Sequence, residues 1–380
     1  MKQIVTNARL QQADELQNII IEDGIIREIC TSCPDDAQII DAGGNLVIAG
    51  IINAHAHFDK SLLIDRKQYV DEPPPVRAGW VREMKQDFTV EDITVRARRL
   101  LDASVRRGII GIRTNVDVDT VVGLKGIEAL LTLKAEYREK LDLHVVAFNQ
   151  EGFLRYPETQ ELLEEALVMG ADSVGGHTSI DATAKQQHID ILFSIAQRRG
   201  VNIDFHADET GRADDHMLPY LIEKTKATGY QGKVNAVHCC SLAVISPEAA
   251  QNDIAGLSDA GIKVIVCPTA IATRQLTDVK GILAAGCTVG LGTDNIQDLF
   301  NPLGNGDMFD IGRLLTFVKR FYTDAEQQAV FEMLTTNGAA FVDVERFAIK
   351  PGNKASLSIL GFSNPAGIYR ADKQLVKRIS

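Results

Sequence analysis

The sequence is poor in the features that mark disulfide-stabilised or membrane-spanning chains. Its 380 residues include six cysteines, and only Cys30 and Cys33 have a C-x-x-C spacing, with no second Cys/His pair at zinc-finger distance. We therefore expect reduced and mostly buried thiols. No basic leader followed by an apolar stretch opens the chain, and its apolar runs are too short to span a bilayer, so we expect a cytoplasmic protein.

Positive charge is also scarce. The chain has 40 Lys and Arg against 51 Asp and Glu, a formal net charge of -11. A chain this acidic has no general electrostatic attraction to nucleic acid or to anionic membranes, so we expect neither as a partner. Hydrophobic residues make up 45% and charged residues 24%, which excludes a disordered chain.

Eight β-rich, nearly continuous apolar runs recur through the centre of the chain, and amphipathic helical stretches separate them. The runs lie at 47–57, 108–118, 141–152, 173–179, 201–209, 233–241, 263–270 and 288–295. Such runs are typical of parallel strands that are buried on both faces. Eight strand–helix repeats in about 250 residues predict a (β/α)₈ TIM-like barrel. No Gly-x-Gly-x-x-Gly turn follows the first run, which disfavours an open dinucleotide-binding sheet.

The two ends of the chain have a different pattern. Residues 1–50 alternate apolar and polar side chains around an Asp-Gly pair at 23–24, a strong hairpin signal, and residues 345–380 resume this alternation. We predict a small β-sandwich built from 1–50 together with 345–380, beside a catalytic barrel at 51–344. The segment 60–92, which holds three consecutive prolines, is predicted to be an irregular insertion and a candidate lid.

Polar side chains that can bind metal follow the predicted barrel strands. They are His55, His57, Gln150, His177, His206, Glu209, His238 and Asp294. Active sites of this barrel lie where the carboxyl ends of the strands meet, so these side chains are expected in one bowl.

The His55-x-His57 spacing suits a shared ion, because residues two apart on a strand point the same way. With His206 and Asp294 the pair makes a set of three nitrogens and one oxygen, which suits Zn²⁺ or Fe²⁺. Two inward histidines can also simply be hydrogen-bonded or solvated, and the spacing alone does not decide. The whole series of polar side chains in phase with the strands favours the metal.

Four motifs carry a resemblance to a known family. N-A-H-A-H-F-D-K-S, H-A-D-E, V-H-C-C-S and G-T-D-N, in this order, resemble the amidohydrolase superfamily and its cytosine deaminase-like branch. The resemblance implies that His55, His57, His206 and Asp294 bind a single divalent metal ion, Zn²⁺ or Fe²⁺. It further implies that Glu209 is the proton-shuttling acid/base. By analogy with these relatives we also expect a homo-oligomer, although no feature of the sequence itself indicates one.

The resemblance also assigns the remaining polar positions. His238 is expected to hydrogen-bond a metal-bound hydroxide, and Gln150 to contact the amide edge of a pyrimidine. Asp294, beside the metal, can take a proton from water as the base. The predicted reaction is hydrolytic deamination of a cytosine-like amino-heterocycle, with release of ammonia. A relative without activity usually lacks some of the ligands, and none is missing here.

Three positions depart from the cytosine deaminase pattern: Lys60, Asn295 and Phe300. All three are expected to face the substrate. The resemblance therefore does not decide on which heterocyclic ring the enzyme acts. The D-K-S sequence that contains Lys60 resembles the corresponding sequence in hydrolases of N-alkylated hydroxytriazines. Lys60 either holds a substrate carbonyl or carboxylate or pairs with an acid near the rim of the bowl. An isopropylammelide-like N-alkyl-aminotriazine hydrolase and a cyclic-amide hydrolase therefore remain as alternatives. His177 either lines the pocket or is a structural histidine.

Overall fold

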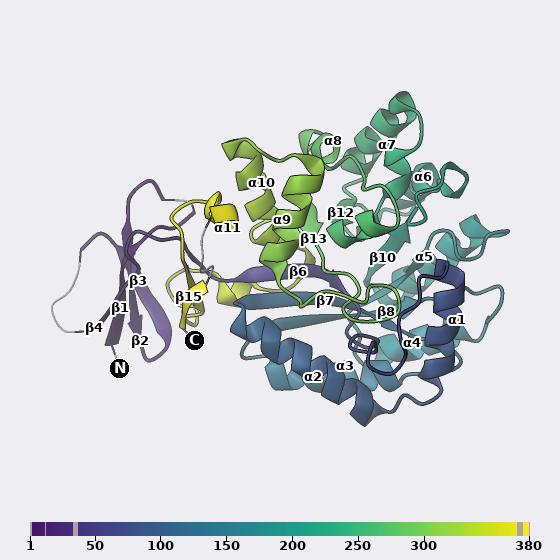
Figure 1. Cartoon of the computed structure of the whole chain (residues 1–380), viewed down its shortest axis with the longest axis horizontal. Helices are drawn as coiled ribbons and strands as arrows, with labels where there is room; N and C mark the ends of the chain where they lie inside the picture. Colours follow the sequence, from purple (N-terminus) through teal and green to yellow (C-terminus); the bar gives the residue numbers. More distant parts are fainter. Residues whose placement is uncertain (1, 12, 33–36, 371–374, 380) are drawn as a thin grey trace.

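The larger part of the molecule is an eight-stranded parallel barrel (Figure 1). The computed structural model describes residues 2–11, 13–32, 37–370 and 375–379. The barrel strands are β6 (Ile51–Ala56), β7 (Ile109–Asp117), β8 (Asp142–Asn149), β9 (Ser173–His177), β10 (Asn202–Ala207), β11 (Val234–His238), β12 (Lys263–Val266) and β13 (Val289–Leu291). Each pairs in parallel with the next along the chain, which confirms the predicted TIM-like barrel.

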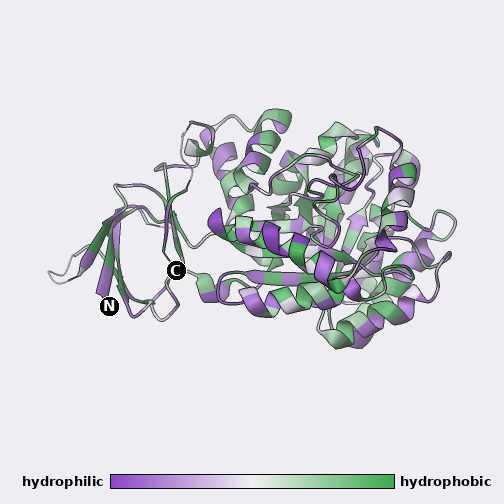
Figure 2. Ribbon diagram, turned by 60° about the horizontal axis from the view of Figure 1, so that its bottom comes forward, coloured by the Kyte–Doolittle hydropathy of each residue, from purple (hydrophilic) through white to green (hydrophobic). Residues whose placement is uncertain are grey.

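Helices pack around the barrel and present polar residues outward, as the hydropathy colouring shows (Figure 2). They are α1 (Pro74–Lys85), α2 (Val90–Arg106), α3 (Lys125–Tyr137), α4 (Thr159–Met169), α5 (Lys185–Arg199), α6 (Leu218–Ala227), α7 (Pro247–Asp259), α8 (Val279–Ala284), α9 (Met308–Lys319) and α10 (Asp324–Leu334). Gly108 and Gly200 stand just past helices with positive φ, as the sequence predicts. In the described part of the chain, no helix is both long and apolar enough to cross a bilayer.

The prediction of an irregular segment over 60–92 is wrong for residues 74–85, which form α1. Two of the three prolines, Pro74 and Pro75, occupy the first turn of the helix. The missing amide hydrogens of proline cost nothing at that position, because the first N–H groups of a helix have no partner inside it. The cluster of prolines therefore marks the start of a helix here and not a loop.

Both chain ends contribute to two small sheets beside the barrel (Figure 1). One sheet holds β1 (Lys2–Ala8), β2 (Gln17–Glu22), β3 (Ile25–Cys30) and β4 (Gln38–Asp41), and the other holds β5 (Val47–Ile48), β14 (Leu357–Leu360) and β15 (Leu375–Ile379). Asp23 and Gly24 form the β2–β3 hairpin turn, and both have positive φ. The predicted hairpin is confirmed. Cys33 lies outside the described residues, so the C-x-x-C spacing is not tested.

A buried ion pair lies inside the barrel, on the amino-terminal side of the strand ends. Arg113 Nε and Nη2 donate to the two oxygens of Asp204 at 2.6 Å each, and Arg113 Nη1 donates to the Phe341 carbonyl at 2.9 Å. Arg113 is two residues before Asn115, and Asp204 two before His206, so all four point into the barrel. This charged layer of side chains lies directly below the layer of strand-end residues that forms the site.

Candidate metal centre and active site

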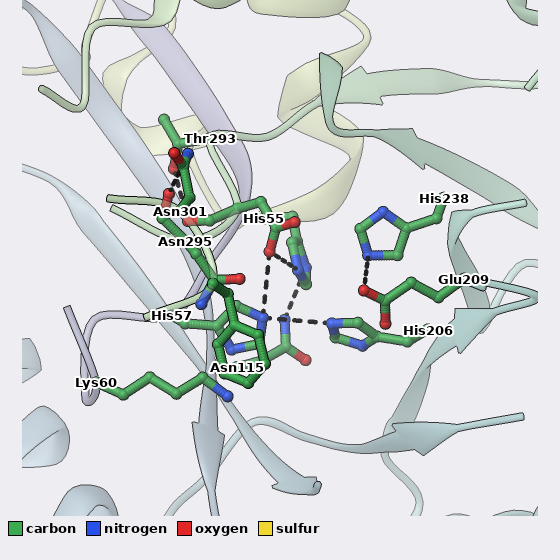
Figure 3. Close-up of polar contacts among 12 residues, drawn as sticks. His55, His57, Lys60, Asn115, His206, Glu209, His238, Thr293, Asn295 and Asn301 are labelled. Carbon is green, nitrogen blue, oxygen red and sulfur yellow. Dashed lines mark hydrogen bonds and ion pairs between the residues drawn. The ribbon is translucent and has the colours of Figure 1, made fainter. Parts of the chain in front are cut away.

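Histidines from three strands converge at the carboxyl end of the barrel (Figure 3). His55 belongs to β6, His57 follows it, His206 belongs to β10 and His238 ends β11. Asp294 comes just after β13, and its amide donates to the His55 carbonyl at 3.0 Å, which brings the last strand against the first. Asp294 and His238 both have positive φ, at 59° and 77°. Strained backbone of this kind in residues other than glycine is concentrated at functional sites.

The distances within this cluster match the coordination sphere of one metal ion. Nε2 of His55 and Nε2 of His57 lie 3.6 and 3.5 Å from Asp294 Oδ1, and the Nε2 atoms of His57 and His206 are 3.3 Å apart. Bonds of about 2.0–2.2 Å around a tetrahedral ion place neighbouring ligand atoms about 3.3–3.6 Å from each other. These three separations fall in that range, and in the described residues His55, His57 and Asp294 form one of the groups whose ligand atoms lie close enough to share an ion.

The hydrogen-bonding state of the cluster also fits a metal. His55 Nε2 is buried and has no hydrogen-bond partner, while its Nδ1 lies 2.9 Å from the Asn115 side-chain amide. A half-turn of that amide presents the otherwise unpartnered Asn115 Oδ1 to an Nδ1–H of His55, which leaves Nε2 free for a metal. Burial, reinforced by neighbouring positive charge, holds the pKa values of His57 and His206 well below the ordinary value, so both rings are neutral and able to bind an ion.

Glu209 stands beside this cluster and is fixed on both of its oxygens. Arg274 Nη2 donates to Oε1 at 2.8 Å, and His177 Nδ1 lies 3.2 Å from Oε2. His238 Nε2 is 3.9 Å from Oε1. Burial alone would raise the pKa of the Glu209 carboxyl, but Arg274, His238 and His177 outweigh it and hold the pKa well below its ordinary value. Glu209 is therefore an ionised carboxylate that faces His238.

Lys60 and Gln150 lie beside the cluster, and Figure 3 shows Lys60 across the histidines from Glu209. The Lys60 ammonium is 2% exposed and donates to Asp117 Oδ1 at 2.8 Å and to Gln150 Oε1 at 2.9 Å. Gln150 Nε2 lies 2.8 Å from His177 Nε2. Lys60 therefore pairs with an acid, one of the two roles predicted for it, and it also borders the bowl.

The comparison with known proteins decides the family. The sequence model of the Amidohydrolase family matches residues 80–375. This chain belongs to the amidohydrolase family. The family predicted from the strand-end motifs is confirmed, and members of this family normally bind a divalent metal.

Two kinds of relative resemble this amidohydrolase over nearly its whole length. N-isopropylammelide isopropyl amidohydrolase of Pseudomonas sp. (strain ADP) is 30% identical over 95% of this chain and 91% of its own. The structure of 5-methylcytosine deaminase from Klebsiella pneumoniae, liganded with 5-fluorocytosine, aligns with a TM-score of 0.92 at 29% identity, over 100% of this chain and 95% of that one. N-isopropylammelide isopropylaminohydrolase from Burkholderia multivorans aligns with a TM-score of 0.88 at 26% identity, over 100% and 97%. These likenesses agree with the cytosine deaminase-like branch.

The loop after β13 holds the last two predicted substrate contacts of the amidohydrolase. Asn295 Nδ2 donates to Asp298 Oδ2 at 2.5 Å, so this amide is engaged within the loop. The Phe300 ring lies with its centre 5.9 Å from Lys60 Nζ. Asp298 also accepts the amide hydrogens of Phe300 and Asn301, at 2.8 and 2.9 Å. Phe300 thus borders the bowl beside Lys60, and Asn295 is held by the loop.

The sequence reasoning missed several side chains that shape the site. Arg274 follows the short helix after β12, and its place on Glu209 has no signal in the strand pattern. Cys267 lies at the end of β12 and forms a compact group with His238 and Asp294. For Asn115 and Asp117 the sequence leaves lining the bowl and capping a helix open and favours the structural role, whereas their spacing of two on β7 places both on the inward face.

Proposed function

We propose that this amidohydrolase removes an amine substituent from a nitrogen heterocycle by hydrolysis. In the overall reaction water supplies the oxygen that becomes a ring carbonyl, and the carbon–nitrogen bond to the substituent breaks. The nitrogen leaves as ammonia or as an alkylamine. The observation that carries the proposal is the Glu209 carboxylate, which is fixed beside His238 at the edge of the His55–His57–His206–Asp294 cluster.

The four residues of the cluster would hold one divalent cation, Zn²⁺ or Fe²⁺. Such an ion, when bound, lowers the pKa of water from 15.7 to about 7 and so supplies hydroxide at neutral pH. Asp294 Oδ1 faces the Nε2 atoms of His55 and His57, in the position of a ligand. Burial raises the pKa of the Asp294 carboxyl, but the nearby histidines outweigh it and hold the pKa well below the ordinary value, so Asp294 is ionised and can accept a proton.

Glu209 is assigned the transfer of a proton to the substrate. Because its pKa is low, it is ionised at rest and must first take up a proton. It takes up the first proton that the attacking water loses and delivers it to a ring nitrogen, and the second proton of that water, accepted by Asp294, passes to the departing amine. A positioned acid/base of this kind is worth about 10²–10⁴ in rate. His238, 3.9 Å from Glu209 Oε1, is assigned to hydrogen-bond the attacking oxygen.

Two substrates are candidates, and the contacts of Gln150 bear on the choice. A cytosine ring presents an N–H donor beside a carbonyl acceptor on its amide edge, so it needs one acceptor and one donor from the protein. Gln150 Oε1 already accepts from Lys60, and both residues offer hydrogen atoms. An edge rich in donors suits a ring with several carbonyl groups, such as an N-alkyl-ammelide. This observation supports the aminotriazine as a second candidate beside the cytosine-like ring.

The test is product analysis with the zinc- or iron-loaded enzyme on cytosine, 5-methylcytosine and N-isopropylammelide. Ammonia from the pyrimidines supports the deaminase, isopropylamine supports the triazine hydrolase, and a ring-opened carboxylate supports the cyclic-amide hydrolase.

We expect Glu209→Gln to lower kcat by about 10²–10⁴. Glu164→Gln, an exchange in a surface ion pair with Arg198 and Arg199, serves as the control with normal turnover. An enzyme that holds its metal and releases no amine from any of the three contradicts the proposal.

A further inference from the structure

A continuous series of polar contacts crosses the barrel mouth from one side of the metal cluster to the other. Asp117, at the end of β7, accepts from Lys60, and Lys60 also donates to Gln150. Gln150 contacts His177 at the end of β9, and His177 contacts Glu209 after β10. The series therefore joins the residues assigned to substrate recognition to the residue assigned to proton transfer.

The direction of each hydrogen bond in this series follows from its first member. A lysine ammonium has only donors, so Gln150 must turn its carbonyl oxygen to Lys60. The Gln150 amide nitrogen then points to His177 Nε2 at 2.8 Å, and it also has only donors to offer. His177 Nε2 must therefore accept, and its proton must sit on Nδ1. Nδ1–H faces Glu209 Oε2 at 3.2 Å and donates to it.

Glu209 thus receives hydrogen bonds on two different oxygens from two different elements. Arg274 binds Oε1 and His177 binds Oε2, so the plane of the carboxylate is fixed. Each oxygen keeps a second lone pair free for the substrate. Arg274 brings a positive charge, whereas the Nδ1–H form of His177 brings only a hydrogen. The two contacts together orient Glu209 without a second cation beside it.

From this geometry we propose that His177 is a positioning residue, which holds Glu209 in its working orientation and links that orientation to Gln150 and Lys60. The proposal rests on the proposed function, since it assumes that Glu209 moves the proton. A substrate that binds Lys60 and Gln150 then also stabilises the hydrogen bond from His177 to Glu209, which orients the Glu209 carboxylate. His177 acts through Glu209 and is not itself required to touch the substrate.

A purely structural role for His177 has to be separated from this one. Its ring packs 4.7 Å from the His206 ring and 5.3 Å from the Phe148 ring, centre to centre. Two substitutions divide its functions, because the asparagine amide stands near the position of Nδ1 and the glutamine amide near that of Nε2. His177→Asn keeps a donor for Glu209 and loses the contact to Gln150. His177→Gln keeps the contact to Gln150 and loses the donor for Glu209.

The kinetic test compares these two variants. We expect His177→Gln to lower kcat about 10–100-fold, because misplacing a reacting group by about 1 Å can cost about 10²-fold. We expect His177→Asn to act mainly on KM, with the smaller loss of kcat. His144→Leu is the control, since His144 bonds Ser173 near the opposite end of the barrel strands. Equal losses of kcat in both His177 variants contradict the proposal.

A second measurement does not depend on turnover. Nitrogen NMR of the zinc-loaded holoenzyme, labelled on histidine, reports which ring nitrogen carries the proton, and the signals missing in His177→Asn identify His177. We expect the proton on Nδ1, and a second form to appear when Gln150→Leu removes the donor to Nε2. Gln251→Leu, on the exposed face of α7, is the control without effect. A proton on Nε2, or on both nitrogens, at neutral pH overturns the assignment of His177, whatever the substrate is. If the expected form is seen in an enzyme that releases no amine, the proposed function fails and the assigned hydrogen bonds stand.

Discussion

At the scale of single residues, Asp298 organises the loop that carries Asn295 and Phe300. Its carboxylate is fully buried and accepts from the Asn295 amide and from two backbone amides. Burial raises its pKa to about 6, because the loss of hydration outweighs these donors. The loop that borders the bowl therefore depends on an acid that ionises close to the physiological range.

The raised pKa of Asp298 predicts a pH dependence of stability. Its folded pKa of about 6 lies above the unfolded value of about 3.9, so the folded state keeps the proton longer. The contribution of Asp298 to the free energy of unfolding therefore falls as pH rises from about 4 to about 6, by up to about 3 kcal/mol in total. Urea unfolding at pH 4, 5, 6 and 7 should show this fall in wild type relative to Asp298→Asn. A difference that rises with pH over this window contradicts the assignment.

The sequence predicted some residues of the site and could not predict others. His55, His57, His206, His238 and Asp294 were predictable because strand phase and barrel geometry place them at one end. The position of Arg274 was not predictable. Arg274 follows a short helix whose direction depends on packing, and such packing leaves no periodic pattern in the sequence. The hydrogen bond between Asn295 and Asp298 was missed for the same reason: it is set by the turn of a loop.

At the scale of elements, α1 lies against two of the segments that border the barrel mouth. Lys85, its last residue, is 2% exposed and lies 2.7 Å from Asp117 Oδ2 and 2.7 Å from Asp119 Oδ2. Arg77, in the first half of the helix, donates to the Phe300 carbonyl at 3.2 Å. The helix is therefore tied to the end of β7 and to the loop after β13, on two sides of the site. Asp117 is shared between Lys85 and Lys60, so α1 and the substrate side of the bowl depend on one carboxylate.

Removing Lys85 should release α1. Lys85→Met leaves Asp117 with Lys60 alone and Asp119 without a cation, and breaking a buried pair in this way costs about 3–5 kcal/mol. We expect the cost to appear first as undocking of α1, measured as faster protease cleavage in segment 64–73 before global unfolding. Arg98→Met, in a half-exposed ion pair with Glu136, is the control and should leave cleavage unchanged. Unchanged cleavage in Lys85→Met would show that the tie does not hold the helix.

At the scale of the whole molecule, the two chain ends meet in one small core. Val5, Ile19 and Ile21 from the amino-terminal sheet pack in the same buried cluster as Leu357 and Ile359 near the carboxyl end. The alternating pattern of both ends predicted this meeting, because each exposes one apolar face that needs cover. The pairing itself was not predictable: β4 lies parallel to β1, and β5 pairs with β14 across some 300 residues of chain. Local patterns define faces, whereas register depends on distant partners.

The metal cluster depends on the closure of the barrel between β13 and β6. At Gly292 the two strands approach so closely that there is no room for a side chain. A Cβ atom at this position would lie 2.6 Å from His55 Cβ and 2.7 Å from the His55 carbonyl oxygen. Backbone cannot move aside as a flexible side chain can, so any larger residue must push the end of β13 away from β6. The same displacement would move Asp294 away from His55 and His57, since Asp294 N is bonded to the His55 carbonyl.

Gly292→Ala should therefore weaken metal binding as well as stability. We expect about 10–100-fold lower metal affinity, the range found when a ligand's support is removed, and a loss of about 1–3 kcal/mol from overpacking. Metal content after dialysis against a graded chelator measures the first effect, and thermal unfolding of the zinc-loaded enzyme the second. Gly79→Ala is the matched control, because Gly79 lies in α1 with open space at its Cβ, and alanine should be neutral or stabilising there. Wild-type metal retention in Gly292→Ala would mean that Asp294 is not held at the ion by the β13–β6 contact, and the proposed ligand set would lose its oxygen.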